Sequence, residues 1–166
     1  MLQRIQTVYM LASTIAVLML FLFPLAVFET RDAIFELNAF GLYSVTPEVT
    51  VDVMQWALLI LLLIMLLLPL VSIFMYRKQK LQMRLLIYAS VLDVFFYVFF
   101  YVFELDACVD IILPVLQSAE LKDSVRLIAI IMPGLSIFGN IMAIKGVCYD
   151  IALLASADRL RSSRKK

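Results

Sequence analysis

Four long apolar runs, separated by shorter polar stretches, dominate the pattern of this chain. A helix needs about 20 predominantly apolar residues to cross a bilayer. The runs that approach or exceed this length cover residues 5–28, 53–76, 85–103 and 127–149. A fifth apolar stretch, residues 109–116, is too short to cross and contains Pro114. The pattern predicts an all-α integral membrane protein, a single membrane domain over residues 1–166 built as a four-transmembrane-helix bundle.

The first run shares one feature with a cleaved signal peptide, because the basic residue Arg4 precedes its apolar stretch. The stretch is longer than the about 7–15 residues of a signal peptide. In addition, residues 23–28 (FPLAVF) offer no pair of small residues for signal peptidase. We therefore expect a retained signal anchor.

Basic residues gather on one side of the predicted bundle. That side holds Arg4, Arg77, Lys78, Lys80, Arg84, Arg159, Arg161, Arg164, Lys165 and Lys166. The other side holds Arg31, Lys122 and Arg126. Lys and Arg accumulate in the cytoplasmic loops of membrane proteins, so we expect both termini in the cytoplasm. The outer loops are then residues 29–52 and 104–126, which carry most of the acidic residues.

The two outer loops lead to different predictions. In the first, residues 33–37 and 40–45 are short aromatic and β-branched runs that predict a β-hairpin. A lone hairpin is marginal in water, so it should lie on the outer membrane surface or pair with another element. In the second, residues 108–113 are a candidate strand and residues 119–126 a candidate helix start. We favour an interfacial segment that lies flat there over a folded recognition domain.

Composition agrees with a location in the membrane. Of the 166 residues, 64% are hydrophobic and 16% are charged, and the mean hydropathy is +1.02. Soluble domains average roughly 45–50% apolar and 25% charged residues. One soluble core could not hide this much apolar surface, which excludes a cytosolic enzyme, a secreted disulfide scaffold and a disordered tail. A net charge of +1 gives no support to nucleic-acid binding.

Residues suited to catalysis or to metal binding are scarce. The sequence has no His, which is the commonest metal ligand and general base. It also has no nucleophile elbow, no phosphate-binding glycine loop and no close acid pair at a membrane face. Cys108 and Cys148 fall on opposite sides of the predicted bundle, so they cannot pair within one chain. We expect a non-enzymatic protein without catalytic residues, metal or cofactor.

One acidic residue, Asp93, lies well inside a predicted span, roughly 12 Å from the cytoplasmic end of its helix. The candidate intramembrane polar site comprises Asp93, Asn140, Lys145, Ser90 and Ser136, with Ser13 and Thr14 nearby. An intramembrane carboxyl is costly and faces the bundle interior by default. In one interpretation Asp93, neutral or paired with Lys145, fixes the helix register; in the other it binds a proton or cation with the help of Asn140. We favour the structural role, because a single acid without a second acid or a His makes a poor relay.

Two further patterns concern the helix surfaces. Gly134, Gly139 and Gly146 lie on the fourth span, where small residues allow helices to approach closely. Residues 95–103 (FFYVFFYVF) are mostly aromatic. Aromatic belts are expected at membrane interfaces. The rings are denser than a belt requires, so the alternative is a contact surface for a lipid tail or a partner helix.

The two ends of the chain carry recognisable segments: residues 1–9 (MLQRIQTVY), residues 156–161 (SADRLR), Asn140, residues 143–146 (AIKG) and Asp150. In these segments the chain resembles an uncharacterised family of small bacterial four-span membrane proteins, of the domain of unknown function 4293 type. The resemblance implies the four-span fold and brings no catalytic residues. Residues 151–155 (IALLA) are less charged than in the family, which predicts that the fourth helix continues as an amphipathic or buried extension.

The terminal motifs meet at the cytoplasmic face of the predicted bundle, where the first helix begins and the fourth ends. They contain Gln3, Arg4, Gln6, Asp158, Arg159 and Arg161. Arg4 and Asp158 could clasp the two helices, but an exposed ion pair contributes only about 0–1 kcal/mol. We favour a cytoplasmic docking patch for another subunit, since a clasp alone would not need Gln3, Gln6 and Arg161.

The functional expectation follows from the large uniform apolar surface and the matched terminal motifs. We expect a multi-pass protein of the bacterial inner membrane that acts as an accessory or assembly subunit of a larger membrane complex. Its partners would be the lipid bilayer and other membrane protein subunits, with a bound lipid as a further candidate. The alternative is a small transporter or lipid-binding protein that uses the polar site around Asp93 and Asn140.

Overall fold

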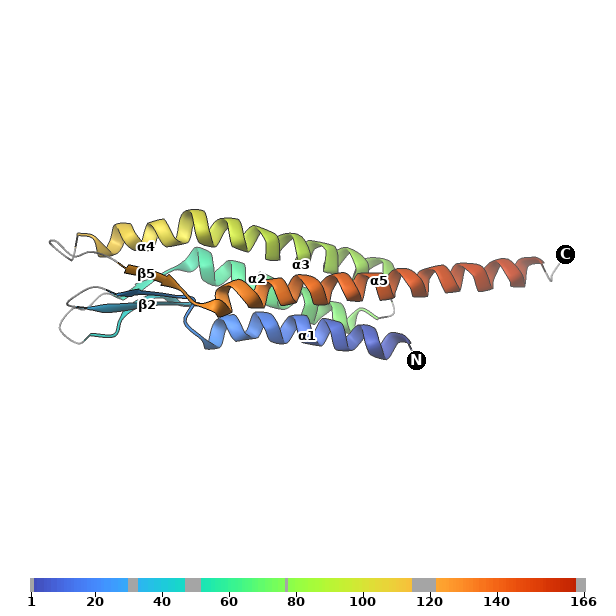
Figure 1. Ribbon diagram of the computed structural model, residues 1–166. Helices are drawn as coiled ribbons and strands as arrows, with labels where there is room; N and C mark the ends of the chain where they lie inside the picture. Colours follow the sequence, from blue (N-terminus) through green and yellow to red (C-terminus); the bar gives the residue numbers. More distant parts are fainter. Residues whose placement is uncertain (1, 30–32, 47–51, 77, 115–121, 164–166) are drawn as a thin grey trace.

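The computed structural model describes residues 2–29, 33–46, 52–76, 78–114 and 122–163, and the side chains of all of these except 2–4, 122–124 and 157–163. Four long helices run alongside one another, and a small sheet lies at one end of them (Figure 1). The long helices are α1 (Leu2–Leu22), α2 (Trp56–Phe74), α3 (Gln79–Phe99) and α5 (Leu127–Ser163). Each includes a stretch long and apolar enough to cross a membrane. The four helices are compatible with the predicted four-helix membrane bundle.

α3 is the start of a longer helix. It continues without a break through a π-helical turn, η1 (Phe100–Glu104), into α4 (Leu105–Ile112). The last part of this helix buries Leu105, Cys108 and Ile112, and spacings of three and four residues between buried positions are typical of a helix. The strand predicted over residues 108–113 is therefore wrong.

Five short strands form an antiparallel sheet in the order β4-β3-β2-β1-β5. They are β1 (Ala26–Glu29), β2 (Ile34–Asn38), β3 (Gly41–Ser44), β4 (Asp52–Met54) and β5 (Lys122–Val125). β2 and β3 confirm the predicted hairpin, which pairs with β1 on one side and with β4 on the other. The prediction of an all-α fold is corrected by this sheet, although most of the described residues are helical.

Two of the predicted boundaries shift because of the sheet. α1 ends at Leu22 instead of continuing to Phe28, because Pro24 cannot donate a helical hydrogen bond and the residue before it prefers an extended backbone. The chain after Pro24 enters β1, which pairs with β5. The candidate helix start in the second outer loop is wrong where it is described, since that segment is β5 and α5 begins only at Leu127.

The second outer loop is not a flat segment where the structure describes it. Its first part is the end of η1 and α4, which prolong α3, and its last part is the edge strand β5. Residues 115–121, which include the beginning of the candidate helix start, lie outside the described residues.

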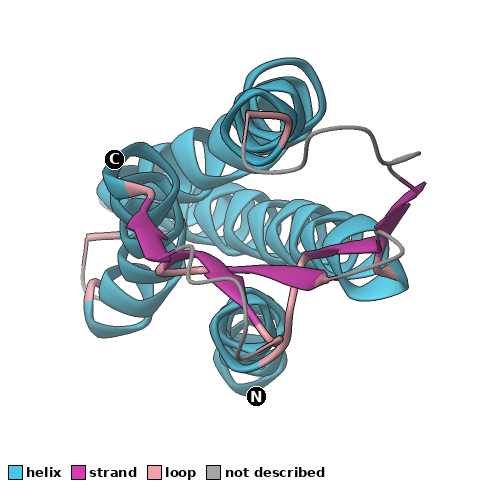
Figure 2. Ribbon diagram, turned by 90° about the vertical axis from the view of Figure 1, so that its left-hand side faces the viewer, coloured by secondary structure: helices cyan, strands magenta, loops and turns pink. Residues whose placement is uncertain are grey.

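The sheet and the helices share one apolar core. Phe28, Phe35 and Leu42 of the sheet are fully buried, as are Leu62 and Phe96 of the helices. All five belong to the same cluster of core side chains. Seen end-on, the strands lie across the bundle (Figure 2). The sheet therefore packs directly onto one end of the four helices.

Gly41, at the tip of the β2–β3 hairpin, allows β3 and β4 to approach closely. Gly41 has a φ of 152°, and a Cβ at this position would lie 2.2 Å from the carbonyl oxygen of Val53. We expect Gly41→Ala to lower the free energy of unfolding by about 1–3 kcal/mol, measured by thermal unfolding in detergent. Val45→Ala is the control, because Val45 is 56% exposed. Equal effects of the two substitutions would contradict the close approach of β3 and β4.

Candidate functional site

The four long helices close a ring in which each packs against two neighbours. α1 and α3 both contact α5, and both also contact α2. α5 therefore presents one face to α1 and another to α3. The polar side chains inside the bundle gather where these two faces meet.

α1 and α5 approach each other closely because two glycines of α5 carry no side chain. A Cβ at Gly139 would lie 3.0 Å from the carbonyl oxygen of Tyr9, and a Cβ at Gly146 would lie 2.6 Å from Cγ of Gln6. The two glycines are seven residues apart, which places them on the same face of α5 two turns apart. This confirms that small residues on the fourth helix permit close packing.

A hydrogen-bonded network of four buried side chains joins α1, α3 and α5. Oδ2 of Asp93 accepts hydrogen bonds from Ser136 Oγ at 2.9 Å and from Asn140 Nδ2 at 3.1 Å. Ser13 Oγ donates to Asn140 Oδ1 at 2.9 Å and lies 2.8 Å from Ser136 Oγ. All four residues are buried, with Asp93 only 1% exposed. The structure thus brings together three of the five predicted members of the polar site, with Ser13 as the fourth member of the network.

The hydrogen-bonded network has one oxygen–oxygen contact more than its serine hydroxyl protons can fill. Its three oxygen–oxygen contacts need three hydroxyl protons, whereas Ser13 and Ser136 carry one each. A proton on Oδ2 of Asp93 would supply the third, with the direction of the Asp93–Ser136 bond reversed: Asp93 would donate to Ser136, Ser136 to Ser13, and Ser13 to Asn140. The second carboxyl oxygen, Oδ1 of Asp93, is buried without a hydrogen-bond partner among the described residues. The arrangement can hold three helices in register, and it can bind a proton.

Two predicted members do not join the network. Ser90 donates to the backbone carbonyl of Leu86 in its own helix at 3.0 Å, and Lys145 is exposed. Of the two alternatives for Asp93, neutral or paired with Lys145, the pairing is wrong, because the hydrogen bonds to Asp93 in the described part of the chain come from Ser136 and Asn140 of α5. Thr14 likewise donates to the backbone carbonyl of Met10 at 2.9 Å.

At the far end of the α1–α5 interface, Gln6 Nε2 donates to Asp150 Oδ2 at 2.7 Å. Both side chains are buried, with Gln6 only 6% exposed. Gln6 therefore clasps the two helices and is not part of an exposed docking patch. The side chains of the other patch members, Gln3, Arg4, Asp158, Arg159 and Arg161, lie outside the described residues.

Sequence reasoning missed three further buried polar side chains, Ser72, Gln82 and Glu104. Gln82 of α3 donates to the backbone carbonyl of Ser72 at 3.2 Å and contacts Sδ of Met10 at 3.4 Å, so it links α3 to α2 and α1. Glu104, expected in an outer loop, is 3% exposed in η1. Its Oε1 has no partner among the described residues. The signal for Gln82 is its place in the helical series of buried residues Gln82, Leu86, Ala89, Asp93 and Phe96.

Within the part of the chain that the structure describes, no three His, Cys, Asp or Glu side chains gather into a metal-binding group. Cys108 is buried, Cys148 is exposed, and both are free thiols.

A ring of four long apolar helices, joined by buried polar side chains and packed against a small sheet, is compatible with a small four-helix membrane protein. The chain belongs to the family described as "Domain of unknown function (DUF4293)", which it matches over residues 2–160. This confirms the resemblance of the two ends of the sequence. None of the curated proteins compared with the chain matches it.

Substitution of Asp93 tests how the network is held together. Asp93→Leu would leave Asn140 Nδ2 and Ser136 Oγ without their hydrogen-bond partner, and an unsatisfied buried group costs about 1–3 kcal/mol. Asp93→Asn keeps a side chain that can accept from Asn140 and donate to Ser136. We therefore expect Asp93→Leu to lower the thermal midpoint in detergent clearly and Asp93→Asn to lower it little. Ser90→Ala is the control, and equal damage by Leu and Asn would contradict a neutral network.

Two glycines of α5 provide a matched test of the close α1–α5 approach. A Cβ at Gly139 meets the backbone of α1, whereas a Cβ at Gly134 meets only the hydroxyl of Tyr97, at 3.2 Å. We expect Gly139→Ala to destabilise the bundle by about 1–3 kcal/mol, the typical cost of overpacking. Gly134→Ala should cost less, because a side-chain tip can move. Thermal unfolding in the same detergent compares the two variants, and a reversed order would contradict the interface.

Proposed function

We propose that the protein is a non-enzymatic accessory or assembly subunit of a larger bacterial inner-membrane complex. The projecting end of α5 carries this proposal. α5 has 37 residues and is about 55 Å long, whereas α1 has 21 residues and is about 32 Å long. The last contact described between the two helices is the Gln6–Asp150 hydrogen bond, and α5 continues beyond it, past the start of α1 (Figure 1).

The projecting end of α5 is apolar where it leaves the bundle. Every residue from 152 to 156 is exposed, with Leu153 at 45% and Leu154 at 57%. The projecting end, residues 151–163, is short, and a lone helix shorter than about 12–15 residues is marginal in water. Burial of a Leu side chain contributes about 1.5–3 kcal/mol. A helix of a partner subunit packed along Leu153 and Leu154 would stabilise this end. The extension predicted for the fourth helix is thus a candidate docking arm, which we define as residues 151–163 of α5. Gln6 is buried, so this docking arm replaces it as a proposed contact for the partner subunit.

A second surface inside the bilayer suits a partner helix. Phe95, Phe99 and Phe103 follow one another at intervals of four residues, and their rings stack with centroids 6.1 and 6.2 Å apart. Phe95 and Phe103 are 49% and 60% exposed. This stripe offers rigid aromatic area without polar groups, as an intramembrane helix contact requires.

The docking arm is tested by removing its two leucines. We expect Leu153→Ser/Leu154→Ser to lose a stoichiometric partner when native complexes are purified in mild detergent and identified by mass spectrometry. Ala152→Ser/Ala155→Ser is the matched control, since it changes the same segment but removes little apolar area. Recovery of the unchanged protein with lipid alone, and with no partner in any amount, would contradict the proposed role. Arg159→Glu/Arg161→Glu extends the test to the basic end of α5.

The second candidate function is a small transporter that uses the Asp93 network. The buried, unpartnered Oδ1 of Asp93 and the missing hydroxyl proton favour it. Transport lost in Asp93→Asn, with partner assembly unaltered, would favour this function over the structural role of Asp93. A proton flux unchanged by the same substitution would exclude it.

A further inference from the structure

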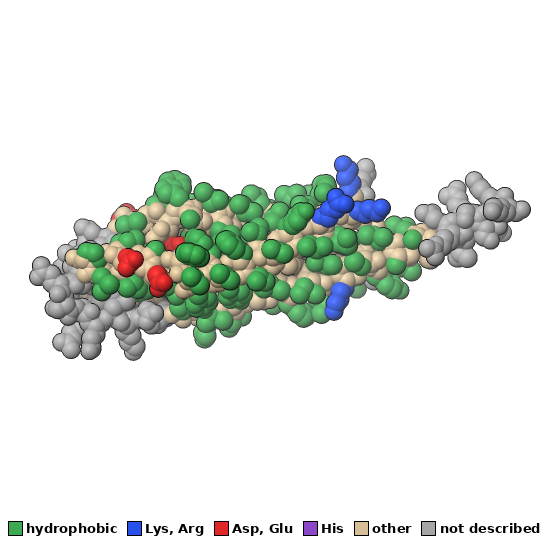
Figure 3. All heavy atoms as spheres, turned by 90° about the horizontal axis from the view of Figure 1, so that it is seen from above, with side chains coloured by type: hydrophobic (Ala, Val, Ile, Leu, Met, Phe, Trp, Pro, Cys, Tyr) green, Lys and Arg blue, Asp and Glu red, His purple; other side chains and the backbone are tan. Residues whose placement is uncertain are grey.

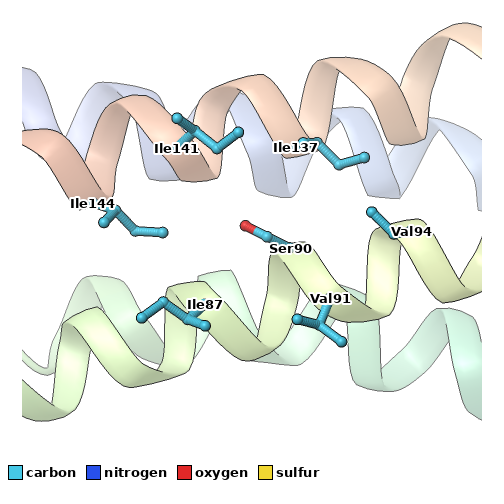
Figure 4. Close-up of a pocket in the computed structure, with 7 residues that line it drawn as sticks. All are labelled: Ile87, Ser90, Val91, Val94, Ile137, Ile141 and Ile144. Atoms are coloured by element: carbon cyan, nitrogen blue, oxygen red, sulfur yellow. The ribbon is translucent and has the colours of Figure 1, made fainter.

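The outer side of the α3–α5 interface holds an apolar groove. Its walls are Ile87, Val91 and Val94 of α3 and Ile137, Ile141 and Ile144 of α5, and its volume is about 410 Å³. These side chains line the space between the two helices (Figure 4). The one polar side chain in the groove, Ser90, already donates to the backbone of its own helix. The groove therefore has the lining that a hydrocarbon chain needs and leaves its hydroxyl donor satisfied.

The groove continues along the same two helices to a basic end. A second hollow, of about 290 Å³, is lined by Lys80, Met83 and Arg84 of α3 and by Cys148 and Ile151 of α5. Lys80 and Arg84 are both exposed.

The two hollows follow one another along one face of the α3–α5 pair, because their lining positions repeat at three or four residues on each helix. On α3 the positions run 80, 83, 84, 87, 90, 91 and 94, and on α5 they run 137, 141, 144, 148 and 151. Such spacing keeps the positions on one helix face. Basic side chains gather near this end of the face drawn in Figure 3, and acidic side chains near the other end.

We propose that this groove is a binding site for one anionic phospholipid of the leaflet on the basic side. Its phosphate would lie at Lys80 and Arg84, and an acyl chain would lie along the apolar part between α3 and α5. The proposal is independent of the proposed function, because it uses neither the projecting end of α5 nor the Asp93 network.

The dimensions of the groove fit a phospholipid. From Lys80 to Val94 the helix rises about 21 Å, and half of a bilayer with its headgroups measures about 20–22 Å. The basic pair therefore falls at the depth of the phosphates when the apolar part reaches toward the bilayer centre. Charge complementarity selects an anionic headgroup over a zwitterionic one.

A second copy of the chain fits this surface less well. Two copies related by an axis along the bilayer normal would bring the same basic ends together. Lys80 and Arg84 of one copy would then face a like-charged end, and like charges across an interface are unfavourable.

Lipid binding to the purified full-length protein is the direct test. We would titrate dioleoyl phosphatidylglycerol or dioleoyl phosphatidylcholine and measure the first lipid adduct by native mass spectrometry. The preference for the anionic lipid should be roughly tenfold or more, as expected of two basic side chains beside one headgroup. Lys80→Gln/Arg84→Gln should abolish the preference. Lys78→Gln/Lys145→Gln removes the same charge from exposed positions that do not line the groove, and it should preserve the preference.

A second pair of variants tests the apolar part. Val91→Trp fills the groove and should weaken binding of both lipids at least fivefold. Val98→Trp, at an exposed position one heptad further along α3 that does not line the groove, should leave binding unchanged. Circular dichroism and gel filtration verify that all variants fold. Equal binding of the two lipids, equal loss in both charge variants, or a dimer that Val91→Trp disrupts would overturn the proposal.

Discussion

The burial of polar groups among apolar helices is the constraint on which this fold depends, because a polar group removed from water is costly unless it finds a hydrogen-bond partner within the protein. Asp93 is the most demanding of these groups. Oδ2 of its carboxyl group finds its partners only when α5 is rotated so that Ser136 and Asn140 face α3. Asn140 in turn needs Ser13 of α1. One acidic side chain thereby sets the rotation of three helices, and the outward-facing surfaces of those helices follow from it.

The pairing of α1 with α5 extends this constraint over the length of the molecule. At one end, β1 follows α1 and β5 precedes α5, and the two strands pair with each other. In the middle, Gly139 allows the backbones to approach, and at the other end Gln6 binds Asp150. The first and last helices of the chain are thus joined from the sheet to the opposite end of α1. The projecting end of α5 begins where this pairing stops, so its direction is fixed by the bundle.

Local patterns could predict the elements whose signal lies within one stretch of sequence. Hydropathy located the four helices, short aromatic and β-branched runs located the hairpin of β2 and β3, and depth along the helices brought Asp93 and Asn140 together. What failed depends on partners far away in the chain. β5 is the short segment KDSV, which has no apolar alternation and forms a strand because β1 supplies an edge. Gln6 resembled a surface residue of a terminal motif until Asp150, on the other side of the bundle interface, became its acceptor.

The two faces of the α3–α5 contact also explain how one pair of helices can hold both a polar network and a lipid groove. Residues one position apart on a helix point about 100° apart. Asp93 and Asn140 therefore turn inward, while their neighbours Val94 and Ile141 line the groove. The spacing of α3 and α5 fixes both the reach of Ser136 to Asp93 and the width of the groove. A lipid in the proposed groove and a proton on Asp93 would therefore both depend on the same distance between α3 and α5.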